Sequence, residues 1–296
     1  MVETLTIPLV NLQLERSDII DLGASKIIPI SRVSDPIRSM ARLGIETDTY
    51  PPALPVDYVL QTQSEQKVDD AQAEVFLNRA LTVFKLFKDS LVFSNVIVIG
   101  DPPERAYGLR HYKPWSRVPI ERYSLADNET KQFVEFWKRF IGVNPGSFPV
   151  YRFHLADFRP YLRDRVVDYV DSLEYLFVPD SGEGEISYKF RSRGTLLIGH
   201  DKNSESKGRI YEALKRAYTL RSAIVHGNAD KEDQLLKDST WEDEIAPIRC
   251  YDREAIKFFF IAGCIDDSEK RRTLLEKRLI FDAEMSWKTP EDFARS

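Results

Sequence analysis

Residues 209–228 read RIYEALKRAYTLRSAIVHGN, a stretch in which apolar residues recur with the period of an α-helix. One stripe along this helix consists of Ile210, Leu214, Ala217, Arg221 and Ile224. Arg221 therefore occupies a position where the pattern favours an apolar side chain, and a buried guanidinium requires a partner or a function. The helix is expected to end at His226, because Gly227 readily adopts the left-handed conformation that closes helices.

Arg221 and His226 lie five positions apart, which places them roughly 140° apart around the helix axis. They can share a site only if the arginine side chain wraps around the helix, or if a second element, such as another copy of this helix, supplies the opposite wall. Arginine binds a phosphodiester as a planar, permanently charged fork, and histidine can move a proton near neutral pH. The two residue types together indicate phosphate chemistry.

Residues 218–227, YTLRSAIVHG, resemble the signature of the HEPN superfamily, in which an arginine is followed after four to six residues by a histidine. The Arg-Ser and His-Gly pairs are similar to those of its ApeA-like branch. The resemblance extends from about Arg152 to Asn228, through residues 172–177 and 188–193. It implies an all-helical domain that forms a homodimer and cleaves RNA without a metal, with both Arg/His pairs in one shared cleft.

The resemblance assigns catalytic roles to Arg221 and His226 and a supporting role to Glu174, which matches the acid that holds the motif arginine. Ser222 and Asn228 are candidates for a further hydrogen bond to phosphate. An exposed helix face is an equally good interpretation of Glu174 on sequence alone. A structural alternative also exists for the catalytic pair: a histidine that interacts with the helix dipole and an arginine paired with Glu174. The glycine after His226 and the acid on the preceding long helix favour the catalytic interpretation.

Arg191 and Arg193 fall on a basic position of the resembled pattern and are expected to extend a phosphate-binding surface. The alternative is a solvated basic face, which is at least as good an interpretation for Arg193. The charge distribution agrees weakly with RNA binding. Residues 131–230 contain 16 basic and 13 acidic side chains, whereas acidic side chains are in excess before and after them. The overall charge of −5 argues against an unselective nucleic-acid coat.

The chemistry implied by the resemblance is transesterification at an RNA phosphodiester, with a 2′,3′-cyclic phosphate as product. RNA, with tRNA among the candidates, is the expected partner, and no metal or cofactor is expected. Since the ApeA-like branch is associated with defence against phage, the expected role is a toxin or an anti-phage effector. A non-catalytic module that binds RNA or a nucleotide remains an alternative. A toxin controlled by nucleotidyl transfer to a tyrosine just past the histidine fits less well, because the next tyrosine is Tyr251.

With 296 residues, the chain is long enough for two domains. Its apolar runs stay well short of the roughly 18 residues that span a membrane, and its start lacks a basic signal-peptide region, so we expect it in the cytoplasm. The pattern predicts an α+β protein: a mainly β sensing or regulatory domain over residues 1–123, followed by an all-α, HEPN-like bundle over residues 124–296. The first domain contains no cluster of catalytic residue types.

Short apolar runs predict strands at residues 5–14, 19–22, 27–30, 58–62 and 91–99. Four prolines between residues 32 and 57 predict a surface excursion without a helix. Helical periodicity predicts helices at residues 70–88, 127–141, 157–177, 185–198, 204–226, 253–265 and 269–281.

Overall fold

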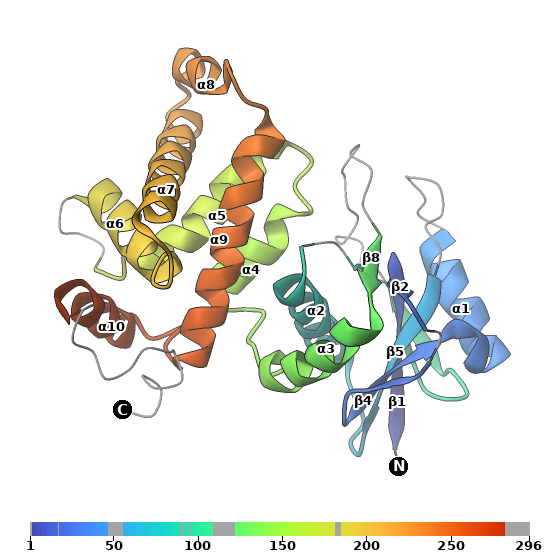
Figure 1. Ribbon diagram of the computed structural model, residues 1–296. Coiled ribbons are helices and arrows are strands. Elements are labelled where there is room, and N and C mark those ends of the chain that lie inside the picture. Colours follow the sequence, from blue (N-terminus) through green and yellow to red (C-terminus); the bar gives the residue numbers. More distant parts are fainter. Residues whose placement is uncertain are drawn as a thin grey trace. The chain divides into compact units, whose positions relative to one another are not determined.

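The structure is a computed structural model, and it describes residues 2–16, 18–46, 56–89, 92–94, 96–108, 122–180 and 185–281. The chain divides into two compact units, Met1–Pro145 and Gly146–Ser296. The described strands all belong to the first unit, whereas the described elements of the second are helices (Figure 1). The α+β class predicted from the sequence is confirmed.

The first unit is built on an antiparallel sheet. Among the described residues its strands follow the order β3 (Ile20–Asp21), β4 (Ser25–Pro29), β5 (Val56–Ser64), β1 (Glu3–Val10), β6 (Val96–Ile99) and β7 (Arg105–Gly108). The register of the two central strands pairs Ile7 with Leu60. A smaller parallel pair joins β2 (Leu12–Leu14) to β8 (Tyr123–Leu125). Each apolar run from which a strand was predicted overlaps at least one of these strands, although the strand in 91–99 begins only at Val96.

Helix α1 (Asp35–Glu46) packs on one face of this sheet, after the short 3₁₀ helix η1 (Ile30–Arg32). The contact is an apolar cluster formed by Ile30, Val33, Ile37, Val59 and Val98. The sequence predicted no helix here because the segment is rich in proline. Pro36, however, lies in the first turn of α1, where its missing N–H would have no partner within the helix. The later prolines of this segment lie outside the described residues.

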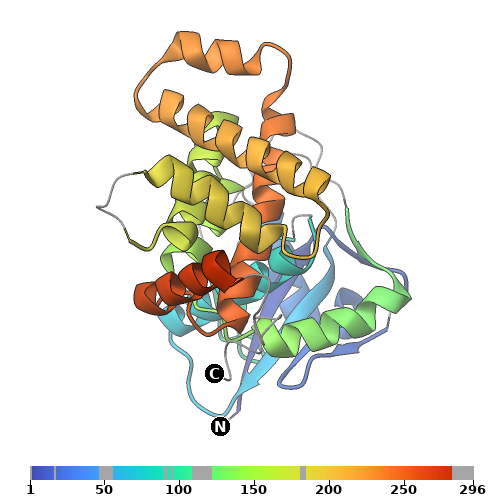
Figure 2. The same cartoon turned by 60° about the vertical axis from the view of Figure 1, so that its left-hand side comes forward.

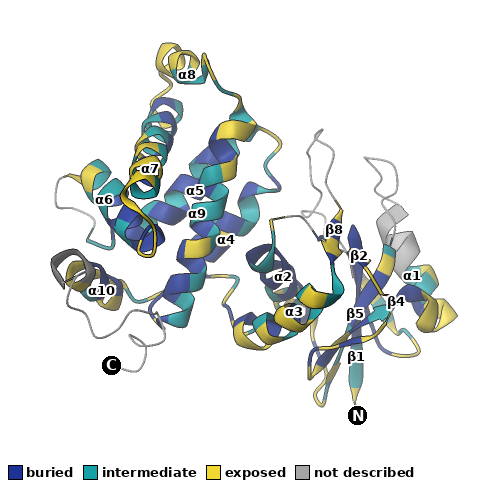
Figure 3. Cartoon of the chain, viewed as in Figure 1, coloured by how far each residue is buried: buried dark blue, intermediate teal, exposed yellow. Residues whose placement is uncertain are grey.

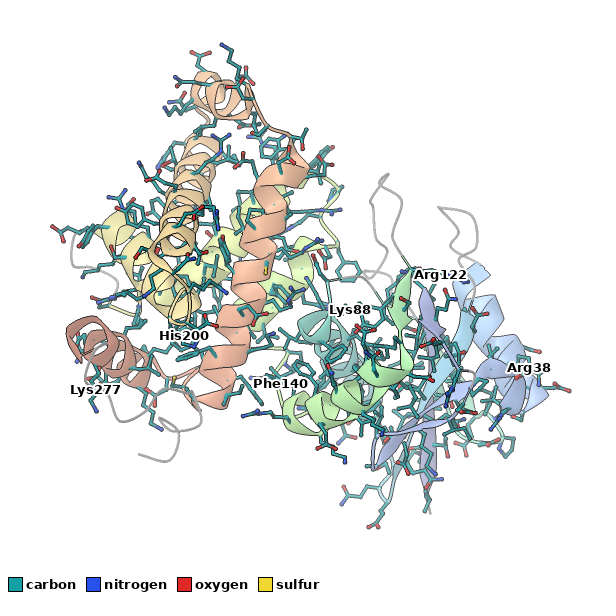
Figure 4. The ribbon with its side chains drawn as sticks, in the orientation of Figure 1. Arg38, Lys88, Arg122, Phe140, His200 and Lys277 are labelled. Atoms are coloured by element: carbon teal, nitrogen blue, oxygen red, sulfur yellow. The ribbon has the colours of Figure 1, made fainter. Side chains whose placement is uncertain are left out.

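Helices α2 (Asp70–Phe87) and α3 (Asp127–Phe140) pack together through aromatic rings, on the sheet face opposite α1 (Figure 1). The ring of Phe84 stacks on Phe133 at 4.9 Å and meets the edge of Trp137 at 6.0 Å. Lys88, labelled in Figure 4, joins the same helices by donating hydrogen bonds to Glu129. This packing places α3 in the first unit, so the boundary follows Pro145 rather than residue 123.

The second unit surrounds one central helix. Its helices are α4 (Phe148–Ala156), α5 (Leu162–Phe177), α6 (Ile186–Ile198), α7 (Ser204–Val225), α8 (Ala229–Leu236), α9 (Trp241–Ile261) and α10 (Ser268–Phe281). α5 contacts α4, α6, α7, α9 and α10 and is largely buried, whereas α8 has no buried residue (Figure 3). α6 and α7 lie side by side (Figure 2). No described helix combines the length and apolar character needed to cross a membrane.

Two features of the helical unit differ from the sequence prediction. α4 was not predicted, because most of its few residues are apolar and show no clear helical stripe. α9 begins at Trp241 rather than near residue 253, although Pro247 lies inside it. Proline normally interrupts a helix by removing one hydrogen bond. Here Pro247 lies only two turns from the start of a long helix, which continues through the residues that pack on α5.

Gly194 permits the close approach of α6 to its neighbours. A Cβ atom at this position would lie 2.7 Å from side-chain carbons of both Leu214 and Phe177. We predict that Gly194→Ala lowers the free energy of unfolding by about 1–3 kcal/mol, the usual effect of overpacking a core. Urea denaturation followed by circular dichroism measures this change.

Gly208→Ala is the matched control, because Gly208 also lies within a helix but has open space around its Cα. Replacing an exposed helical glycine by alanine should stabilise the protein by up to about 1 kcal/mol. Equal effects of the two substitutions would show that α6 does not pack as closely as described.

Candidate functional site

The motif helix α7 ends as the sequence predicted. The backbone N–H of His226 donates to the Ser222 carbonyl at 3.0 Å, and Gly227 has a φ of +67°. The N–H of Asn228 then donates to the Ala223 carbonyl at 2.9 Å, which completes a left-handed cap. This cap places His226 at the exposed end of α7, and within the described residues its imidazole forms no hydrogen bond or ion pair.

A pocket of about 250 Å³ lies at this end of α7. It is lined by Tyr218, Thr219, Ser222, Ala223, His226, Asn228 and Lys231. The pocket therefore brings together three residues that the sequence singled out, His226, Ser222 and Asn228, and adds Tyr218 and Lys231. Together they offer a hydroxyl, an amide, an ammonium group and an imidazole. Such a set can bind an anion and exchange a proton with it.

Asn228 has two roles at this pocket. Its side-chain oxygen accepts a hydrogen bond of 3.1 Å from the backbone N–H of Lys231 and so caps the start of α8. The side-chain amide nitrogen remains as a donor, since Asn228 makes no other side-chain hydrogen bond among the described residues. The cap thus fixes the amide between the end of one helix and the start of the next.

Arg221 is held in place by Asp171 of α5. Its Nε and Nη2 atoms donate to Asp171 Oδ1 at 3.0 and 2.8 Å, and the arginine side chain is 24% exposed. The sequence assigned this holding role to Glu174, but within the described residues Glu174 forms no hydrogen bond. Its Oε2 atom is buried without a partner. Glu174 acts on Arg221 through its charge, and Asp171 supplies the directional bonds.

Burial and neighbouring charges shift the pKa values of Glu174, Arg221 and Tyr218. Burial raises the pKa of the Glu174 carboxyl; the charge of Arg221 opposes this rise and that of Asp171 adds to it. Burial alone would lower the pKa of Arg221, but its hydrogen bonds to Asp171 raise that pKa overall, so the guanidinium stays charged. Burial, reinforced by Glu174, also raises the pKa of Tyr218, which keeps the phenol neutral. A permanent cation and a neutral hydroxyl are therefore close enough to interact, and the hydroxyl belongs to Tyr218, which lines the pocket.

Asp171 belongs to a longer row of alternating charges. Arg152 of α4 donates to Asp168 at 2.5 Å and lies 3.5 Å from Asp171, and Arg159 donates to Asp168 at 2.6 Å. The side chain of Asp168 is only 1% exposed. Asp168 and Asp171 thus each lie next to two guanidinium groups. This network restricts the positions that Arg221 can adopt.

The two further arginines predicted to bind phosphate have different environments. Arg193 is 5% exposed and donates to Asp180 and to the Phe177 carbonyl. It also lowers the pKa of Asp180 far below its ordinary value. Arg193 is therefore an internal structural link and cannot reach a substrate. Arg191 is only partly buried and lies beside the rings of Tyr188 and Tyr211.

The sequence reasoning missed three residues of this region: Asp171, Tyr218 and Lys231. Asp171 lies three positions before Glu174, so helical geometry places both on neighbouring parts of one face. That spacing was available in the sequence and could have identified Asp171. Lys231 had no comparable signal, because α8 was not predicted. Within the described part of the chain, no group of three or more His, Cys, Asp or Glu side chains is arranged to hold a metal ion.

Comparisons of this chain with protein-family models, with curated proteins and with solved structures find no match. The functional interpretation therefore depends on the pocket at the end of α7, on the group formed by Arg221, Asp171 and Glu174, which we call the Arg221 cluster, and on the motif at residues 218–227. The pocket and the cluster lie on one helix and its direct neighbours, within the second unit.

Glu174→Gln should stabilise the protein at neutral pH. The folded-state pKa of Glu174 lies above its ordinary value of 4.5, so the folded chain binds this proton more tightly than the unfolded chain does. The ionised carboxyl therefore lowers the free energy of unfolding above the folded-state pKa, and this penalty disappears below about pH 4.5. Urea denaturation at pH 7 and pH 4 should show a gain for the variant that is present at pH 7 and lost at pH 4.

Glu212→Gln provides the control, since Glu212 is 65% exposed on α7 and its surface ion pair contributes little. A destabilised Glu174→Gln variant at pH 7 would contradict the prediction. It would mean that the attraction between Arg221 and the Glu174 carboxylate stabilises the fold more than burial of that carboxylate destabilises it.

Proposed function

We propose that this chain is a metal-independent endoribonuclease of the HEPN type, similar to the ApeA-like branch. One observation carries the proposal: the pocket that contains His226, Ser222, Asn228 and Lys231 adjoins a helix face on which Arg221 is fixed by Asp171. A proton-transfer group next to anion-binding groups suits cleavage of a phosphodiester. The resemblance of residues 218–227 to the Arg/His signature supports the same chemistry.

In the proposed reaction, neutral His226 removes the proton from a ribose 2′-hydroxyl, and the oxygen attacks the adjacent phosphorus. The new O2′–P bond replaces the P–O5′ bond, and the departing 5′ oxygen takes up a proton. The products are a 2′,3′-cyclic phosphate and a 5′-hydroxyl. Arg221 would stabilise the charge on the non-bridging oxygens, while Ser222 and Asn228 donate hydrogen bonds to the phosphate.

The placement of Arg221 and His226 supports a site shared by two chains. Arg221 donates hydrogen bonds to Asp171 on α5, whereas His226 lies exposed at the end of α7, roughly 140° away around the helix. Within one chain, the guanidinium and the imidazole therefore face different directions. In a homodimer formed through the helical unit, the partner's His226 would face the Arg221 of this chain, and a second imidazole would protonate the departing oxygen.

We assign a regulatory role to the first unit. It contains a pocket of about 550 Å³ between the end of β5 and the start of α2, lined in part by Gln63, Lys67, Val75 and Arg79. This mixture of apolar and polar side chains suits a small molecule or a short peptide as trigger. A toxin or anti-phage effector needs such a restraint, because an unregulated ribonuclease harms its own cell. RNA, with tRNA among the candidates, is the proposed substrate.

His226→Ala should abolish cleavage of RNA without unfolding the protein. Loss of a general base lowers the rate by about 10²- to 10⁴-fold, and His226 is exposed and makes no side-chain contact that folding requires among the described residues. The assay incubates total RNA with the purified full chain in EDTA and analyses the products by gel electrophoresis. Labelled fragments should end in a 2′,3′-cyclic phosphate.

Two further variants make this test specific. His200→Ala removes an exposed histidine from the turn between α6 and α7, labelled in Figure 4, and should leave the rate unchanged. Arg221→Lys keeps the charge next to Asp171 but loses the planar fork, so the rate should fall, and thermal unfolding of this variant measures how much stability is lost with the second hydrogen bond to Asp171. Cleavage at the normal rate by His226→Ala would refute the proposed nuclease. RNA binding without cleavage by the wild-type chain would favour the non-catalytic binding module.

Removing the first unit should increase toxicity. A restraining unit can inhibit only by stabilising the inactive arrangement, and its loss shifts the population towards the active one. The truncated chain should begin at Gly146, because α3 belongs to the first unit and would expose Phe133 and Trp137 if separated from α2. Growth after induced expression compares residues 146–296 with the full chain. A soluble, harmless truncated form beside a toxic full chain would show instead that the first unit supplies substrate binding.

A further inference from the structure

Arg191 of α6 lies close to two tyrosine rings. Its guanidinium carbon is 5.3 Å from the ring centre of Tyr211 on α7 and 5.9 Å from that of Tyr188 on α6. Both distances are within the range of a cation–π interaction. Tyr188 is 55% exposed, so much of its ring faces solvent. The three side chains form a small surface of one cation and two aromatic rings, which we call the Tyr-Arg-Tyr cluster.

The cation of this cluster differs from the other arginines of the helical unit described above. Arg159, Arg193 and Arg221 each donate to a carboxylate. Arg191 has no carboxylate partner within the described residues, and its Nε atom is buried without a hydrogen-bond acceptor. Its position is therefore set by the aromatic rings rather than by an acid. Its terminal N–H groups remain available to an anionic ligand.

The cluster lies on the same side of α7 as the proposed cleavage pocket. Tyr211 and Ser222 are eleven residues apart, which corresponds to about 20° around the axis and roughly 16 Å along it. Lys215 lies between them on the same side, with its side chain 49% exposed. Tyr211, Lys215 and Ser222 thus follow one another along one side of α7, and Tyr188 and Arg191 of α6 lie next to this row at Tyr211.

We infer that the Tyr-Arg-Tyr cluster binds an unpaired nucleotide of the RNA substrate, a few nucleotides from the bond that is cut. A base stacks on the exposed ring of Tyr188 while the guanidinium of Arg191 contacts the neighbouring phosphate. The substrate class is therefore single-stranded RNA or an unpaired loop, because bases in a duplex do not expose their faces. This inference rests on the proposed ribonuclease function and specifies its substrate.

The test measures binding of a fluorescein-labelled, 2′-O-methylated single-stranded RNA to the full chain by fluorescence anisotropy. The methyl groups block the attacking hydroxyl, so the probe cannot be cut. Tyr188→Leu should weaken binding by about 5- to 150-fold, the range expected for a lost base–aromatic stack. Tyr188→Phe should bind as the wild type does, and the duplex form of the same probe should bind Tyr188→Leu and wild type equally.

Two matched variants separate stacking from general effects. Tyr161→Leu removes a tyrosine that is 67% exposed before α5, and it should bind the single strand normally. Arg191→Gln should weaken binding and reduce the slope of log affinity against log salt by about 0.7, the change expected for one lost phosphate contact with a single strand. Thermal unfolding of each variant verifies that the fold is intact.

The outcomes distinguish this inference from the ribonuclease proposal. If the wild type cuts RNA and Tyr188→Leu binds the single strand as tightly as the wild type, the stacking site is refuted and the nuclease stands. If the wild type cuts no RNA but Tyr188→Leu still loses single-strand binding, the nuclease proposal fails and the binding site stands. Equal weakening by Tyr188→Leu and Tyr161→Leu would also overturn the inference.

Discussion

The helical unit depends on the pairing of buried carboxylates on α5 with arginines from its neighbours. Asp168 is almost fully buried, and a carboxylate in that position is destabilising unless cations neutralise it. Arg152 and Arg159 supply those cations from residues that precede α5, and Asp171 of the same helix binds Arg221 of α7. These ion pairs have directional hydrogen bonds, so they fix how the helices rotate against one another, which apolar packing alone specifies less strongly.

This constraint also explains why Arg221 can sit on an otherwise apolar stripe. The stripe faces α5, where Asp171 provides hydrogen bonds and Glu174 provides a second negative charge. The cost of burying the guanidinium is therefore offset within the protein, before any ligand binds. Its remaining N–H groups keep a fixed direction, which is what a group that stabilises developing charge requires. His226, by contrast, is positioned only by the cap at Gly227 and stays open to solvent.

Much of the architecture could be predicted from hydrophobic periodicity, and the exceptions have identifiable causes. α6, α7 and α10 were predicted within a few residues because each has a clear start or stop signal, and α5 ends where predicted but begins at Leu162 rather than at residue 157. α1 was missed because proline was given too much weight near the start of a helix. The first half of α9 was missed because only its second half is strongly apolar. The predicted domain boundary lies before α3, because its helical period alone assigned α3 to the helical domain. Its actual position depends on long-range contact with Phe84, which no local pattern shows.

The candidate site shows a similar division between local and long-range information. His226, Ser222 and Asn228 meet in one pocket because they are close in sequence and a helix cap brings them together. Partners from other helices were harder to assign, and Asp171 was passed over in favour of Glu174. Arg191 and Arg193 illustrate the reason most clearly. They look alike in the sequence, but two residues turn a helix by about 200°, so one guanidinium points to Asp180 in the interior and the other to the rings of Tyr188 and Tyr211. A basic residue on a helix can therefore be assigned to substrate or to structure only when the neighbouring helix on each side is known.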